Sequence, residues 1–192
     1  MSPLNTHHHL TGKVAVFIDA ANVIHCHRDI GWKVDYKKVK KYFEGRCQLT
    51  GIYYYSAYFE ESAGQRSFFE MLDRKGYIVR TKKIRKIRDD DGNMRLKGNC
   101  DTDIVVDAVA SLEQYDTAVL MSGDSDFVSL VNLLKGRGKS VIVISTRGHI
   151  AKDLINAAGE NAYFDLKKFR ETWSFNGNSS GNHKTRLATG LG

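Results

Sequence analysis

The most constraining feature of this sequence is a regular alternation of apolar β-type runs with helical patterns over roughly 160 residues. The β-type runs predict strands at Val14–Asp19, Gly51–Phe59, Tyr77–Ile84, Thr117–Met121 and Ser140–Ile144. The helical patterns predict helices at Tyr36–Gly45, Ala63–Lys75, Asp101–Gln114, Asp126–Arg137 and Ile150–Ala158. Strands joined through helices pair in parallel and are covered on both faces. The sequence therefore predicts an α/β fold, a three-layer α/β/α sandwich with a mainly parallel central sheet.

One segment, Lys86–Leu96, interrupts this alternation. Its Asp91-Gly92 pair lies between Ile87-Arg88 and Met94-Arg95 and has the residue types of a tight β-turn. The sequence therefore predicts a hairpin that protrudes from the sandwich.

The composition agrees with one folded domain between polar ends. Of the 192 residues, 42% are apolar and 27% are charged, which excludes a chain that is disordered over most of its length. The domain is predicted at residues 13–170, with a flexible leader at 1–12 and a flexible tail rich in Gly, Asn and Ser at 174–192. The sequence leaves open a homodimer, and a further domain or protein partner attached through the tail.

Membrane insertion and disulfide bonding are not expected. Apolar runs such as Val141–Ile144 are far shorter than the ~20 residues that span a bilayer, and no secretion signal opens the chain. We therefore expect a cytoplasmic protein with no membrane partner. The cysteines Cys26, Cys47 and Cys100 include no CxxC pair, which argues against a disulfide framework or a zinc site.

The charge balance favours a polyanionic partner such as RNA or DNA. The net charge is +7, from 29 basic and 22 acidic residues, and six positive charges fall within the nine residues of Arg80–Arg88. The residues predicted to contact phosphates are Lys82, Lys83, Arg85, Lys86 and, on another loop, Arg147. The alternative for the basic stretch is a solvated edge strand that its charges protect from aggregation.

Acidic residues follow two of the predicted strands, at the sheet edge where open α/β folds bind ligands. The first strand ends in Asp19-Ala20-Ala21-Asn22, without the glycine-rich loop of a dinucleotide site. The fourth strand runs into Ser122-Gly123-Asp124-Ser125-Asp126. Each Asp is also a good helix N-cap, so capping remains open as the role of any one of them.

A third acidic segment precedes and opens the helix predicted at 101–114. At ~100° per residue, Asp101 shares the side of this helix that carries Ile104 and Ala108, whereas Asp103 and Asp107 point to the other side. Capping and metal binding are both feasible for Asp101. A solvated helix face is the simpler interpretation of Asp107.

Asp19, Asp101, Asp124 and Asp126 are thus expected to converge on one small cleft. Two unit charges ~4 Å apart repel by roughly 4 kcal/mol at an effective dielectric constant of about 20, so such a cluster favours a neutralising cation. Carboxylate ligands without nearby Cys or His pairs favour Mg²⁺ or Mn²⁺ over zinc. A site of this kind suits phosphodiester hydrolysis.

Nearby aromatic and histidine residues are expected to be mainly structural. Along the strand predicted at 51–59, about half of the tyrosines should face the core, and sheet packing is favoured over stacking on bases. His25 and His27 follow the first acidic motif, but the sequence supplies no oriented base partner for a nucleophilic mechanism.

These motifs resemble the NYN family, also called LabA-like, of the PIN-like nuclease superfamily. The resemblance covers residues ~13–168 and is carried by Phe17–Asn22, by Lys97-Gly98 followed by Asp101, by Ser122–Phe127 and by Gly138–Val141, in the order that the family has them. In the family's second motif the Asp usually stands two residues after the Lys-Gly pair, whereas Asp101 stands three after Gly98. The choice between Asp101 and Asp103 for that position therefore stays open.

The resemblance implies a PIN-like, Rossmann-like architecture and a Mg²⁺- or Mn²⁺-dependent endoribonuclease. It assigns metal binding and catalysis to Asp19, Asp101, Asp124 and Asp126, and it adds Asn22 as a polar catalytic residue. Ser122 is a further candidate for orienting phosphate or water, and Asp103 and Asp107 are secondary candidates. The sequence thus predicts a metal-dependent ribonuclease that acts on RNA, with a catalytically weak RNA-binding or regulatory module as the alternative.

Overall fold

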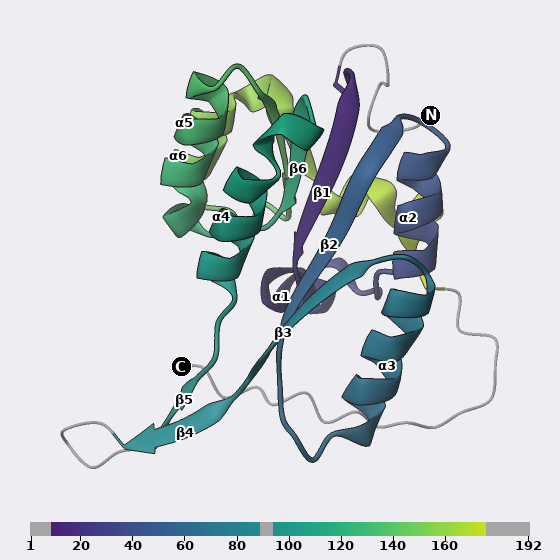
Figure 1. Ribbon diagram of the computed structural model, residues 1–192, viewed down its shortest axis with the longest axis vertical. Coiled ribbons are helices and arrows are strands. Elements are labelled where there is room, and N and C mark those ends of the chain that lie inside the picture. The colour runs from purple at the N-terminus through teal and green to yellow at the C-terminus, as the bar shows by residue number, and fades with distance from the viewer. Residues whose placement is uncertain (1–8, 89–93, 176–192) are drawn as a thin grey trace.

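The computed structural model describes residues 9–88 and 94–175. Within these ranges, six parallel strands form one sheet in the order β3-β2-β1-β6-β7-β8. Figure 1 labels four of them, β1, β2, β3 and β6. The strands are β1 (Lys13–Asp19), β2 (Gln48–Tyr58), β3 (Ile78–Lys83), β6 (Thr117–Met121), β7 (Ser140–Ser145) and β8 (Tyr163–Asp165). The α/β class and the parallel sheet that the sequence predicts are confirmed.

The direction of strand addition reverses beside β1. The chain passes from β1 outward through β2 to β3, then crosses to β6 on the other side of β1 and continues to β7 and β8. Open α/β sheets bind ligands at such a reversal, outside the carboxyl ends of the strands. Here that position lies between Asp19, which ends β1, and the loop that follows Met121 in β6.

Helices cover both faces of the sheet. They are α1 (Ala20–Ile30), α2 (Tyr36–Glu44), α3 (Ala63–Arg74), α4 (Asp101–Ala110), α5 (Val128–Gly136), α6 (Lys152–Ala158) and α7 (Arg170–Trp173). Short 3₁₀ turns are η1 (Leu112–Gln114), η2 (Ser125–Phe127), η3 (Glu160–Ala162) and η4 (Leu166–Phe169). No helix in the described part of the chain is both long and apolar enough to cross a membrane.

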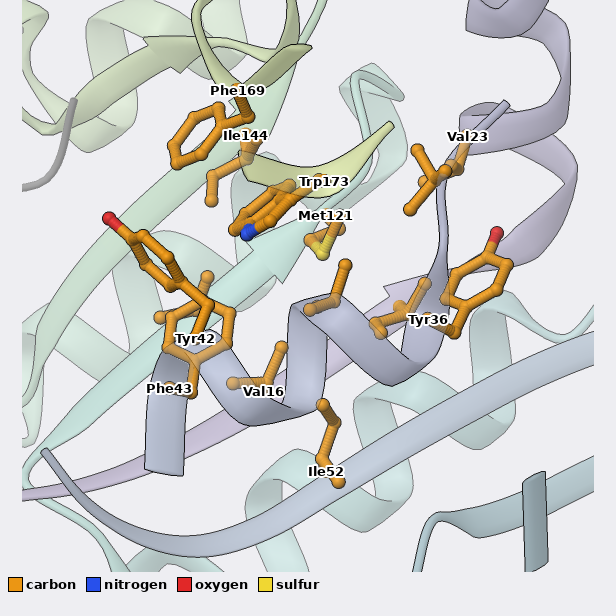
Figure 2. Close-up of a cluster of buried hydrophobic side chains, with 14 of the residues drawn as sticks. Val16, Val23, Tyr36, Tyr42, Phe43, Ile52, Met121, Ile144, Phe169 and Trp173 are labelled. Atoms are coloured by element: carbon orange, nitrogen blue, oxygen red, sulfur yellow. The ribbon is translucent and has the colours of Figure 1, made fainter. Parts of the chain in front are cut away.

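The alternation of side chains along β1 divides the interior into two hydrophobic cores. Val16 and Ile18 belong to the core under α1, α2 and α3, whereas Ala15 and Phe17 belong to the core under α4, α5 and α6. Figure 2 shows part of the first core, including Val16 and Trp173. This two-sided burial produces the three layers of the sandwich.

The packed region reaches slightly beyond residues 13–170. Leu10 is buried, and Trp173 is fully buried and stacks on Phe169 with ring centroids 3.9 Å apart (Figure 2). Ser174 forms an isolated antiparallel bridge with Val34. Most of the predicted leader and tail, residues 1–8 and 176–192, lies outside the described residues.

Two parts of the fold differ from the expectation. The sequence pattern did not predict α1, because the chain passes from β1 directly into this helix with no turn residues between them. The tyrosines of β2 do not alternate between core and surface: Tyr53, Tyr54 and Tyr55 are all buried, and Tyr58 at the end of the strand is partly buried. The reason is that helices cover both faces of the sheet, so period-2 alternation does not expose one side of β2.

The predicted hairpin is present next to the main sheet. β4 (Arg85–Arg88) pairs with β5 (Met94–Lys97) in antiparallel register, and the two strands project from the body of the molecule (Figure 1). The predicted Asp91-Gly92 turn lies outside the described residues. β5 leads directly to the segment Gly98–Cys100 and then to α4, so the hairpin lies beside the start of that helix.

Candidate active site

Asp19 is held in place at the carboxyl end of β1. Its Oδ1 accepts a hydrogen bond from the backbone N–H of Asn22 at 3.2 Å, which caps α1, and its Oδ2 accepts one from the Ser122 hydroxyl at 2.8 Å. Ser122 is fully buried at the end of β6. The hydroxyl of this residue therefore links the two strands that meet at the reversal of the sheet.

The loop after β6 places two more carboxylates at the same edge. Asp124 caps η2, because its Oδ1 accepts a hydrogen bond from the backbone N–H of Asp126 at 3.0 Å. Gly123 allows this loop to pack closely, since a methyl group there would clash with the carbonyl oxygen of His149 and the Ser145 hydroxyl. The sequence at these positions thus brings Asp124 and Asp126 together around one tight turn.

Asp101 completes an acidic triad with these two residues. It is the first residue of α4, and Asn99 Nδ2 donates a hydrogen bond to its Oδ2 at 2.7 Å. Asp101, Asp124 and Asp126 each offer a carboxylate oxygen, and these oxygens all lie within 4.8 Å of one another. We call these three residues the acidic triad. Asp19 lies outside this set but close enough for its charge to act on Asp101 and for the charge of Asp124 to act on it.

The electrostatics of the site reflect this crowding. Burial, followed by the charges of Asp19, Asp124 and Asp126, raises the pKa of Asp101 to about 6. Burial also raises the pKa of Asp19, although the hydrogen bonds from Ser122 and the backbone oppose that change. Negative charges that crowd together in this way are stabilised by a cation. The carboxylate oxygens of the acidic triad are suitable ligands for a divalent cation.

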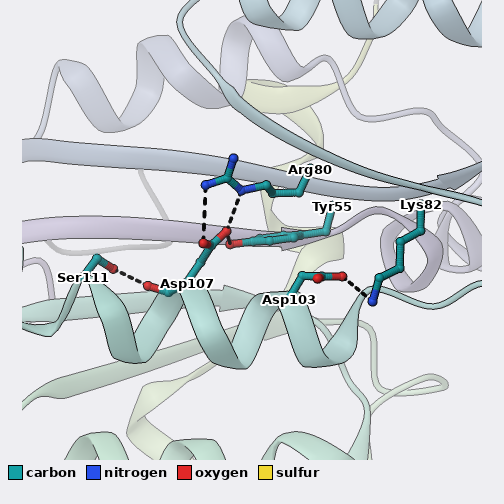
Figure 3. Close-up of polar contacts among 6 residues, drawn as sticks. All are labelled: Tyr55, Arg80, Lys82, Asp103, Asp107 and Ser111. Atoms are coloured by element: carbon teal, nitrogen blue, oxygen red, sulfur yellow. Dashed lines mark hydrogen bonds and ion pairs between the residues drawn. The ribbon is translucent and has the colours of Figure 1, made fainter.

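Asp103 and Asp107 lie on another side of α4 and contact the edge of the sheet (Figure 3). The carboxylate of Asp103 lies 2.6 Å from the ammonium group of Lys82. Asp107 Oδ2 accepts hydrogen bonds from Arg80 Nε and from the Tyr55 hydroxyl, both at 3.0 Å. The structure therefore places Asp101 in the acidic triad and Asp103 in an ion pair beside it. Asp107 holds α4 to β2 and β3 instead of facing solvent alone.

The residues predicted to bind nucleic acid flank the acidic triad on two sides. On β3, Lys82 pairs with Asp103, and Lys83 pairs with Glu60. Arg85 is exposed at the start of β4, and the side chain of Lys86 lies outside the described residues. Arg147 is exposed in the loop after β7, on the other side of β1 in the sheet order.

A buried polar network behind Asn22 was not predicted from the sequence. Asn22 Oδ1 accepts a hydrogen bond from the Ser145 hydroxyl at 3.1 Å, and the thiol of Cys26 lies 3.9 Å from the same oxygen. Thr146 Oγ1 donates to the Cys26 sulfur at 3.4 Å. Ser145 ends β7 at the same sheet edge as Asp19, and this position is the signal that could have identified it.

The two histidines that follow β1 differ in exposure. His25 is exposed, whereas His27 is partly buried and its Nε2 accepts a hydrogen bond from the backbone N–H of Val34 at 3.1 Å. Burial, with the nearby charge of Lys33, lowers the pKa of His27 to about 4. His27 therefore supports the loop before α2 as a neutral acceptor.

Comparisons with known proteins agree with the fold. The NYN domain family matches residues 13–166. The chain is 36% identical over 162 residues to the low amplitude and bright protein LabA of Synechococcus elongatus. The aligned region covers 82% of this chain and 86% of LabA. A crystal structure of the Vibrio parahaemolyticus protein VPA0982, titled as a protein of unknown function, is similar with a TM-score of 0.68 and 26% identity. That similarity covers 81% of this chain and 93% of the other.

Proposed function

Because this chain belongs to the NYN domain family, we propose that it is a Mg²⁺- or Mn²⁺-dependent ribonuclease that hydrolyses phosphodiester bonds within RNA. The observation that carries the proposal is the acidic triad, whose three carboxylates lie within 4.8 Å of one another at the reversal of the sheet. The family belongs to a nuclease superfamily, which supports hydrolase chemistry at this place.

The residues present fit a divalent cation. Three carboxylates converge from the start of α4 and from the turn after β6, and the raised pKa of Asp101 indicates that this cluster favours a neutralising cation. Asp101, Asp124 and Asp126 would hold the ion, with Asp19 next to them. When bound, such an ion lowers the pKa of a coordinated water and stabilises the charge that develops on a phosphate.

The protein's own groups would orient the reactants. Ser122 and the backbone N–H of Asn22 fix the carboxylate of Asp19. Because the side-chain oxygen of Asn22 already accepts a hydrogen bond from Ser145, its amide nitrogen is the group available to donate to a phosphate oxygen. Cations on two sides of the triad, Arg85 and Arg147, would attract the RNA backbone. Because the two arginines lie on opposite sides of the triad, an RNA strand that contacts both would pass through the site, and this favours internal cleavage.

The decisive experiment is incubation of the purified protein with end-labelled RNA and with a circular RNA of the same sequence. We expect cleavage with Mg²⁺ or Mn²⁺ and none with EDTA. Opening of the circle would show internal cleavage, because an exonuclease needs an end. A matched DNA substrate should remain intact. Binding of RNA without cleavage under any metal condition would reject the enzyme and favour an RNA-binding module.

A further inference from the structure

A pocket lies at the carboxyl ends of β2 and β3, apart from the acidic triad. It has a volume of about 310 Å³ and is lined by Phe59, Glu60, Glu61, Lys83 and Ile84. Two of these side chains are apolar, and the other three are charged. We call it the β2–β3 pocket.

The walls of the β2–β3 pocket are held by hydrogen bonds of the backbone. The turn that contains Phe59 is closed by the backbone N–H of Ser62, which donates to the Phe59 carbonyl at 3.0 Å. The backbone N–H of Phe59 donates to Gln65 Oε1 at 3.1 Å. On the other side, the backbone N–H of Ile84 donates to the Tyr58 carbonyl at 2.9 Å. The pocket is therefore preformed and needs little ordering to accept a ligand.

Glu60 and Lys83 join the two walls. Their side chains form an ion pair between the turn after β2 and the end of β3. The carbonyl oxygen of Glu60 also accepts a hydrogen bond from the Arg66 guanidinium at 2.5 Å. With Glu60 engaged in this way, Glu61 is the pocket carboxylate available to accept hydrogen bonds from a ligand.

The β2–β3 pocket shares a sheet edge with the candidate active site. Asp19 at the end of β1 pairs with Tyr55 of β2. Phe59 lies four residues beyond Tyr55, which is roughly 13 Å along the chain at ~3.3 Å per residue. Gly98, three residues before Asp101, approaches so closely that a Cβ there would lie 3.3 Å from Ile84 Cα. The segment that delivers Asp101 to the triad thus packs on a wall of the pocket.

We propose that the β2–β3 pocket binds one unpaired base of the RNA, next to the cleaved phosphate, and that it prefers guanine. This inference rests on the proposed function. Phe59 and Ile84 supply apolar surface against which a splayed base can stack. A carboxylate only accepts hydrogen bonds, and guanine alone presents two adjacent N–H donors on its Watson–Crick edge. Adenine and cytosine place an acceptor beside their amino group, and uracil flanks its N–H with two carbonyls.

Equilibrium binding can test the base preference without turnover. We would use the Asp124→Asn variant with Mg²⁺ and measure fluorescence anisotropy on uridine oligonucleotides that carry a single G, A or C. The G-containing RNA should bind about 10-fold more tightly than the others, because two hydrogen bonds from one side chain to one base discriminate by about this factor. In the same background, Glu61→Gln should abolish this preference. The NH₂ group of the glutamine would face one of the two N–H donors of guanine, and two donors cannot form a hydrogen bond.

Two further variants complete the design. Phe59→Leu, which removes the aromatic face and keeps apolar bulk, should weaken binding of every oligonucleotide about 10-fold. Glu113→Gln is the matched control, since Glu113 is exposed in η1 before the amino end of β6, at the opposite edge of the sheet. It should change neither affinity nor preference. Glu61 is itself exposed, so its substitution does not threaten folding.

The outcomes separate this proposal from the proposed function. Cleavage by the wild-type protein at positions unrelated to guanine, together with equal binding of all three oligonucleotides, would overturn the pocket and leave the ribonuclease standing. A guanine preference that Glu61→Gln removes, without cleavage by the wild-type protein, would support the pocket and overturn the enzyme. A preference that survives Glu61→Gln would also overturn the pocket's role.

Discussion

The ammonium group of Lys82 on β3 lies 2.6 Å from the carboxylate of Asp103 on α4. Asp103 is two residues after Asp101, so this ion pair places a positive charge beside the acidic triad, where it opposes the rise in the pKa of Asp101. Both side chains are partly exposed, at 43% and 37%. A phosphate that approaches the triad can therefore compete with Asp103 for Lys82.

This competition predicts opposite effects of two substitutions on RNA affinity. Asp103→Asn should raise the affinity about threefold, because it frees Lys82 from an exposed ion pair worth less than ~1 kcal/mol. Lys82→Gln should lower the affinity and flatten the dependence of log K on log salt by up to ~0.7 for the lost phosphate contact. Salt titrations of RNA anisotropy in an Asp124→Asn background measure both. Asp73→Asn, an exposed aspartate of α3, is the control.

Turnover gives a second readout for Lys82. This residue should act on the ground state and the transition state alike, so its loss should appear mainly in KM. Unchanged affinity and salt slope in Lys82→Gln would show that β3 is only a charged edge strand. The RNA path would then lie toward Arg147 and Lys152 on the other flank.

Substitution of the acidic residues should remove catalysis without unfolding the protein. Asp19→Asn and Asp124→Asn change side-chain volume little but delete a charge at the site. We expect kcat to fall about 100-fold or more, on the order of the loss of one group that stabilises developing charge. Cleavage of labelled RNA, with circular dichroism to check folding, measures this. Wild-type rates in both variants would reject the assignment of the site.

Divalent metal should raise the melting temperature of the protein. The acidic triad repels itself in the absence of a cation, so an ion that binds only the folded state stabilises it by mass action, by about 2.7 kcal/mol at a concentration 100-fold above Kd. Melting curves with Mg²⁺ or Mn²⁺ up to ~10 mM test this, with Asp124→Asn as the variant that should respond much less. A wild-type curve that stays flat would argue against a preformed metal site.

The sequence could predict much of the fold because the motifs and periodicities are local. Thr117–Met121 coincides with β6, and most other predicted elements begin or end within a few residues of the observed ones. The helix predicted at 126–137 instead divides into η2 and α5, because Asp124 caps a 3₁₀ turn first. β8 is only three residues long, too short for a periodic signal to be recognised.

The site was less predictable where it depends on long-range contacts. Helical periodicity separated Asp101 from Asp103 and Asp107 correctly, since all three share α4. It could not show that Arg80 and Lys82 lie opposite Asp107 and Asp103, because that pairing requires β3 to stand beside α4 (Figure 3). The hydrogen bond from Ser145 to Asn22 joins residues 123 positions apart, and no local pattern encodes it.

The raised pKa of Asp101 predicts a pH dependence of stability in the metal-free protein. Its pKa rises from 3.8 to about 6 on folding, first through burial and then through the neighbouring carboxylates. The folded state therefore binds this proton more tightly than the unfolded chain does. The contribution to stability is complete below pH ~4 and is lost as the pH rises through about 6.

Asp101→Asn should accordingly stabilise the metal-free protein above pH 6 and have little effect on its stability near pH 4. Because Asp101 is only partly buried, solvent screening limits the gain to the order of 1 kcal/mol, or about 2–4 °C in Tm. Melting curves in EDTA at pH 4.5 and pH 7.5 measure it, with Glu113→Gln as the control for loss of an exposed charge.

Addition of Mg²⁺ at pH 7.5 should then reverse the order of the two proteins. The wild-type protein gains the binding energy of the ion, whereas Asp101→Asn has lost one of the three carboxylates that would hold it. The same side chain thus destabilises the empty site and stabilises the loaded one. If Asp101→Asn melts below the wild-type protein in EDTA at pH 7.5, the inferred repulsion is contradicted, because removal of a repelled charge should raise the melting temperature.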